Sequence, residues 1–135
     1  MRPEEVVGRL VVIEARTADR LGFPRVGGRS EADGIRAFRE REERQVGVVE
    51  TAVSLPDPVT QRVFLALCAR YGVEVYRKPR QRSGNVTVRA PRAFVKDALG
   101  PMFQEAGDVF QDWYVDQTEA VLELFASSNG AVLNP

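Results

Sequence analysis

The chain has 135 residues, of which 44% are hydrophobic and 28% charged, and its 19 basic and 19 acidic residues give a formal net charge of zero. These values predict one folded domain over residues 1–135 and exclude an extensively disordered chain. A single cysteine, Cys68, excludes an intramolecular disulfide framework, and the absence of histidine removes the usual zinc ligand and the usual general base.

The first residues include two acids where a secretion signal would be basic and then apolar. No apolar run approaches the length that a membrane span needs. We therefore expect a cytoplasmic protein without membrane contacts. No motif indicates a metal or cofactor, so none is predicted.

The N-terminal segment predicts a helix from about Pro3 to Leu21. A proline suits the first helical turn, and apolar residues recur at helical spacing. The β-branched run within residues 6–15 leaves a strand there as the alternative. Residues 22–30 are rich in glycine and predict a flexible loop, whose glycine spacing does not fit a phosphate-binding loop.

A second helix is predicted from Glu31 to about Ser54, with Ser30 and Asp33 forming a capping box at its start. A third helix is predicted from Pro58 to Tyr71, and its apolar residues lie almost all round it, which is typical of a buried central helix.

Two alternating segments, Val73–Lys78 and Asn85–Ala90, predict a β-hairpin. A fourth helix is expected from Pro91 and should kink or end at Gly100–Pro101. A fifth should run from Asp108 to Ala126, before a frayed tail over residues 127–135. The predicted fold is therefore α+β: a mostly helical single domain of about five helices, with one two-stranded antiparallel β-hairpin between the third and fourth. Its expected core includes Val63, Phe64, Leu67, Cys68, Phe110, Trp113, Val121 and Leu124.

Charge is distributed unevenly along the chain. The segment from Arg70 to Lys96 has a net charge of +7, and the segment from Asp97 to the end has a net charge of −7. The basic residues of the hairpin region can be a solvated turn, a nucleic-acid contact or an arm that docks on another protein. The candidate binding residues are Arg77, Lys78, Arg80, Arg82, Arg89 and Arg92.

Projected on the predicted fifth helix, five acidic residues fall on one stripe. A solvated face, a docking face for basic residues and a carboxylate-only metal site are the alternatives. The metal site is disfavoured because side chains on one straight helix seldom converge on one ion. The candidate interaction residues are Asp108, Asp112, Asp116, Glu119 and Glu123.

No catalytic or metal-binding residues can be assigned, so the function predicted first is a non-catalytic protein-interaction or assembly module. The alternatives are a nucleic-acid-binding protein that uses the basic hairpin 76–92 and, third, a histidine-free enzyme. A two-fold homodimer is expected, because it would place each basic segment against the acidic segment of the other copy and could pair open strand edges. The proposed apolar anchors of this dimer are Phe94, Trp113, Tyr114 and Phe125.

Overall fold

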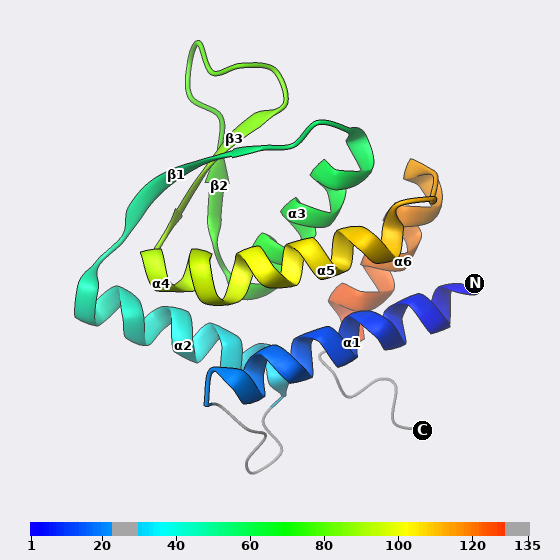
Figure 1. The fold of residues 1–135 in the computed structure, drawn as a ribbon, viewed down its shortest axis with the longest axis horizontal. Helices are drawn as coiled ribbons and strands as arrows, with labels where there is room; N and C mark the ends of the chain where they lie inside the picture. The colour runs from blue at the N-terminus through cyan, green and yellow to red at the C-terminus, as the bar shows by residue number, and fades with distance from the viewer. Residues whose placement is uncertain (23–29, 129–135) are drawn as a thin grey trace.

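Helices and one small sheet make up residues 1–22 and 30–128, the part of the chain that the computed structural model describes (Figure 1). This is an α+β fold, as predicted. The helices are α1 (Pro3–Arg20), α2 (Glu31–Val46), α3 (Pro58–Tyr71), α4 (Arg92–Phe94), α5 (Gly100–Phe110) and α6 (Val115–Ser128), and a π-helical turn, η1 (Val95–Leu99), joins α4 to α5.

The sheet has three antiparallel strands in the order β1-β3-β2: β1 (Val49–Ser54), β3 (Asn85–Ala90) and β2 (Glu74–Tyr76). β2 and β3 form the predicted hairpin, and β1 is a third strand that the prediction lacked. Val86 and Val88 of the central strand are buried against the helices. On the opposite face Thr87 is buried as well, but Glu50, Ala52 and Arg89 are exposed.

The expected second helix is wrong beyond Val46. Gly47 has a φ of 82°, which ends α2, and the β-branched residues that follow pair with β3, Val53 lying opposite Val86. Pairing with β3 therefore outweighs the helical spacing of apolar residues in this segment, and it gives the central strand a second neighbour. The helix predicted over residues 3–21 is confirmed, as is the capping box of Ser30 and Asp33. Asp57 caps α3, its side chain accepting from the N–H of Thr60.

The central position of α3 is confirmed. It packs against α2, α5 and α6, and its residues Val63, Phe64, Leu67 and Cys68 are buried. Phe110 and Val121 are buried as well, but Leu124 is 48% exposed and Trp113 is only half-buried, so these two core predictions are wrong.

The helix that begins after Pro91 does not end at Gly100–Pro101. A π-turn lies just before this point, and the N–H of Gly100 donates to the carbonyl of Val95. A Cβ at position 100 would lie 3.0 Å from that carbonyl oxygen, so glycine suits the tight turn. Because Pro101 has no N–H, the carbonyl of Asp97 lacks its helical donor, and the guanidinium of Arg20 donates to it instead at 2.9 Å.

The single helix predicted over residues 108–126 is also wrong. The chain turns at residues 111–114, where the N–H of Trp113 donates to the carbonyl of Phe110 at 3.0 Å, and α6 starts at Val115. This reversal returns α6 to pack on α1 and α3, which buries Val121, Leu122 and Phe125. A straight continuation would have left those side chains in solvent, so the packing of α6 outweighs its helical continuity.

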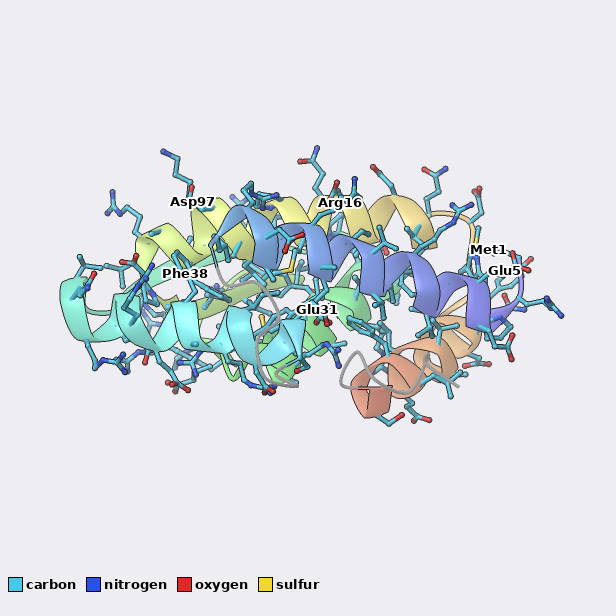
Figure 2. The ribbon with its side chains drawn as sticks, turned by 90° about the horizontal axis from the view of Figure 1, so that it is seen from below. Met1, Glu5, Arg16, Glu31, Phe38 and Asp97 are labelled. Carbon is cyan, nitrogen blue, oxygen red and sulfur yellow. The ribbon has the colours of Figure 1, made fainter. Side chains whose placement is uncertain are left out.

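Seen from below, α1 and α2 lie along the length of the molecule (Figure 2). None of the helices that the structure describes is long and apolar enough to cross a membrane. The predicted loop 22–30 falls largely outside the described residues, as does the predicted tail from residue 129 onward, although α6 includes residues 127 and 128.

Candidate functional site

The loop between β2 and β3 projects away from the helices, at the top of the view in Figure 1. Its four basic residues, Arg77, Lys78, Arg80 and Arg82, are all exposed. Arg80 has a φ of 67°, which no other non-glycine residue approaches in the described part of the chain. A left-handed conformation at such a residue costs about 1–2 kcal/mol, and strain of this kind is concentrated at functional sites.

The side chain of Gln81 holds the loop in shape. Its Oε1 accepts a hydrogen bond from the N–H of Lys78 at 2.9 Å and another from Oγ1 of Thr87 at 3.2 Å. The N–H of Gln81 in turn donates to the carbonyl of Lys78 at 3.1 Å. The guanidinium of Arg77 also donates to the carbonyl of Arg82 at 3.4 Å. The turn that presents Arg80 and Arg82 is therefore ordered without using the charges of these two side chains.

The base of the loop is tied to the end of β1. The N–H of Leu55 donates to the carbonyl of Gly84 at 2.8 Å. Gly84 has a φ of 85°, and a Cβ there would lie 3.1 Å from the carbonyl oxygen of Leu55. A side chain at position 84 would therefore disturb both the turn and its attachment to β1.

The six predicted basic residues do not form one patch. Arg89 and Arg92 lie near the other end of β3, and a rise of about 3.3 Å per residue places Arg89 roughly 13 Å from Asn85 along the strand. Lys78 forms an ion pair with Glu50, and Arg89 lies 3.9 Å from Glu74. Within the described ranges, no carboxylate forms an ion pair with the remaining four, Arg77, Arg80, Arg82 and Arg92.

Below the loop, the site extends onto the face of the sheet that does not contact the helices. A hollow of about 340 Å³ lies between them, lined by Glu50, Ala52, Lys78, Pro79, Arg80, Gln81 and Thr87. The hydrogen bond and charge of Glu50 raise the pKa of Lys78, and the hydrogen bond that Tyr76 donates to Glu50 raises the pKa of Tyr76.

This arrangement can bind anions, but it contains no evident catalytic set. No group of three or more acidic or cysteine residues that could hold a metal ion occurs among the described residues. Neither family models, nor curated proteins, nor solved structures yielded a match to this chain. The function must therefore be inferred from the geometry and charge of the site itself.

The five acidic candidates are all exposed, but they do not form one helical stripe. Asp108 lies on α5 and Asp112 in the turn after it, whereas Asp116, Glu119 and Glu123 lie on α6. Glu119 lies 3.8 Å from Arg62 of α3, so part of this acidic surface is already paired within the chain. The break between α5 and α6 removes the single docking face that the sequence predicted.

Two of the four apolar anchors proposed for a dimer are not available at the surface. Phe94 and Phe125 are buried in the core, and Trp113 is half-buried, with its ring edge-on to Phe110 at 6.1 Å. Only Tyr114, 78% exposed, stands clear of the fold. The four residues therefore do not form the apolar surface that the sequence predicted.

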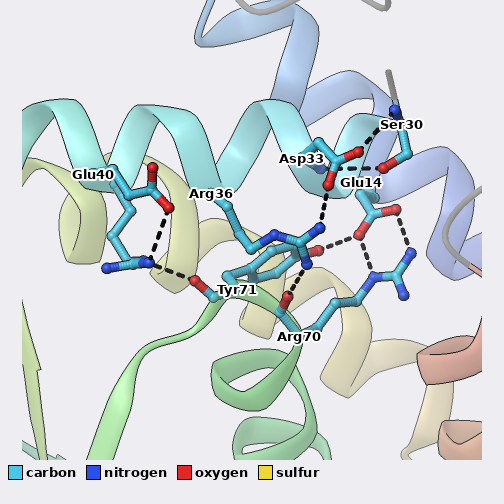
Figure 3. A network of polar contacts seen from close by, with 8 residues as sticks. Glu14, Ser30, Asp33, Arg36, Glu40, Arg70 and Tyr71 are labelled. Atoms are coloured by element: carbon cyan, nitrogen blue, oxygen red, sulfur yellow. Dashed lines mark hydrogen bonds and ion pairs between the residues drawn. The ribbon is translucent and has the colours of Figure 1, made fainter. Parts of the chain in front are cut away.

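A buried polar cluster, absent from the sequence predictions, lies at the centre of the helices (Figure 3). Glu14 of α1 accepts two hydrogen bonds from Arg70 of α3, at 2.5 and 2.9 Å, and one from the hydroxyl of Tyr71 at 2.6 Å. Arg70 also donates to the carbonyl of Phe125 at 2.7 Å, and its guanidinium lies 4.0 Å from the Phe125 ring centre. The cluster therefore connects α1, α3 and α6.

The electrostatics of this cluster favour a charged Arg70 and a neutral Tyr71. Burial alone would lower the pKa of Arg70, but the hydrogen bonds and charge of Glu14 raise it overall. Burial, together with the charge of Glu14, raises the pKa of Tyr71 well above its usual value. Because these side chains bond to one another and lie away from the surface, we assign them to the architecture of the fold.

Burial raises the pKa of the Cys68 thiol to about 12. We therefore expect Cys68 to react with a thiol reagent such as dithionitrobenzoate very slowly in the native protein at mildly alkaline pH, because neither thiolate nor access is present. The absorbance of the released thiol measures the rate, and reaction in denaturant provides the control. Rapid labelling of the native protein would contradict the buried position of this residue.

Proposed function

We propose that this protein binds nucleic acid through the loop between β2 and β3, with Arg80 and Arg82 contacting phosphates. The observation that carries the proposal is that both arginines are exposed on an ordered turn and have no ion pair within the described residues. Arg77 flanks them and adds charge near the same phosphates, whereas the charge of Lys78 is paired with Glu50.

The order of the loop favours binding, because an arginine on a preformed turn loses less conformational freedom when it contacts a ligand. The net charge of the whole chain is zero, so attraction to a polyanion must come from this local excess of charge.

The proposal predicts a salt-dependent complex that requires the loop. Changing both Arg80 and Arg82 to alanine should weaken binding. It should also reduce the steepness of the plot of log affinity against log salt by about 1–2, because the two lost phosphate contacts no longer release counterions on binding. Fluorescence anisotropy with labelled double-stranded DNA, single-stranded DNA and RNA, over a series of salt concentrations, measures affinity and slope together.

The matched control removes two exposed arginines at the start of α1, Arg2 and Arg9, which changes the net charge equally. This variant should bind as the unmodified protein does. No complex with any probe at low salt would overturn the proposal, as would equal losses in the two variants. If polyglutamate displaced the nucleic acids as effectively as an unlabelled oligonucleotide, the loop would instead be an arm for acidic proteins.

A role in assembly is the second candidate, and the free edge of β1 favours it. β1 is an outer strand of the sheet, and β3 is the only element in the described part of the chain that contacts it extensively. We propose that self-association uses this edge in place of the aromatic anchors, two of which are buried.

A further inference from the structure

The edge of β1 leaves backbone hydrogen-bonding groups without a strand partner. The N–H of Leu55 points to β3, where it donates to Gly84. In an antiparallel ladder the direction alternates along the strand, so Val53, Thr51 and Val49 also face β3. The N–H and C=O groups of Glu50, Ala52 and Ser54 therefore point outward from the sheet.

This edge has few of the features that prevent strands from pairing between molecules. β2, the other edge, is only three residues long, which itself limits pairing. β1 spans six residues, contains neither lysine nor proline, and has Glu50 as its one charged residue, whose charge is paired with Lys78. Val46, 67% exposed, and the exposed Val48 and Val49 add apolar surface beside it.

We infer that a second copy of this chain pairs with β1 in antiparallel fashion about a two-fold axis, joining two sheets into one. This deepens the assembly role proposed above and does not depend on nucleic-acid binding. A two-fold axis perpendicular to the sheet keeps each side chain on the same face of the joined sheet. Odd-numbered residues of one copy must therefore lie opposite odd-numbered residues of the other, and even-numbered opposite even-numbered.

The register centred on Thr51 makes β1 complementary to itself. The backbone N–H and C=O groups of Glu50 and Ala52 point outward from the edge. Glu50 of each copy therefore exchanges backbone hydrogen bonds with Ala52 of the other copy. Val49 then lies opposite Val53 of the other copy on the helix-facing side, in the closer type of pair that suits β-branched residues. No like charges oppose one another directly.

Two arguments favour a second copy over an unrelated strand. The same short segment supplies both the half-exposed Val53 and the exposed Val49 that would cover it. The one carboxylate of the strand meets an alanine, which avoids desolvating a second charge. An isologous contact of this size buries little area, so we expect a dimer that dissociates in the micromolar range.

Sedimentation equilibrium of nucleic-acid-free protein tests the pairing. The mass should rise with concentration across the micromolar range toward twice the 15.0 kDa of one chain. Ala52→Pro should hold the mass at that of a monomer, because proline removes an outward N–H and is tolerated on an edge. A constant monomer mass for the unmodified protein would overturn the inference, as would dimerisation of Ala52→Pro to the same extent.

Two further substitutions at the same exposed position test the register. Ala52→Glu would face Glu50 of the other copy twice, and the dissociation constant should increase about tenfold. Ala52→Lys would face the same carboxylates favourably and should dimerise at least as well as the unmodified protein. Equal weakening by both would contradict the register centred on Thr51, because in a register centred on Ala52 either charge would oppose itself. Circular dichroism confirms that each variant is folded.

Discussion

Replacing Arg70 with alanine is expected to lower the free energy of unfolding by about 3–5 kcal/mol, because it leaves the buried carboxylate of Glu14 without its counter-charge. The carbonyl of Phe125 would also lose its donor, and the stacking of the guanidinium on the Phe125 ring would be lost. Guanidinium unfolding, followed by circular dichroism, measures the change.

A double-mutant cycle separates this ion pair from general damage to the core. The double variant Glu14→Ala with Arg70→Ala should be destabilised by less than the sum of the two single variants, because no uncompensated charge remains. Arg62→Ala is the matched control on the same helix: its pair with Glu119 is half-exposed, so about 0–1 kcal/mol is expected. Additive single effects would show that Glu14 and Arg70 are not coupled.

The sequence predicted the elements whose signals are local. Capping residues and apolar spacing located α1 and α3, and alternation located β2 and β3. The errors arose where distant contacts decide. Residues 49–54 form a strand because β3 offers them an edge, and α6 separates from α5 because its apolar face must return to α1 and α3.

The candidate site was predictable in composition but not in arrangement. The exposed arginines of the loop follow from the turn between two alternating segments. The ion pair between Glu50 and Lys78 could not be found, because Glu50 had been placed in a helix. The β-branched run that begins after Gly47 was the available signal for that strand. No sequence signal identified Gln81 as the residue that orders the loop.

The buried cluster did have a signal. Glu14 follows Leu10 by four residues and Val7 by seven, so it lies on the same face of α1 as these apolar residues. Arg70 similarly follows Leu67 by three residues and Val63 by seven on α3. One acid and one base on two otherwise apolar faces indicate a buried pair, because neither charge is tolerated in a core without the other.

Leu67→Ala is expected to lower the free energy of unfolding by roughly 2–5 kcal/mol, because Leu67 is 4% exposed on the helix that the other helices surround. The lost side chain leaves a cavity, and rigid neighbours on α2, α5 and α6 can close it only in part. Urea unfolding, followed by the fluorescence of the single tryptophan, measures the loss.

Leu65→Ala provides the comparison that isolates burial from helix propensity. Both substitutions make the same chemical change in the middle of α3, but Leu65 is 42% exposed, so a loss below about 1 kcal/mol is expected. The difference between the two variants is then the cost of the cavity, since the change in helix propensity cancels. Equal losses would mean that the face of α3 bearing Leu67 is not the buried one, and the packing of the other helices around α3 would have to be rejected.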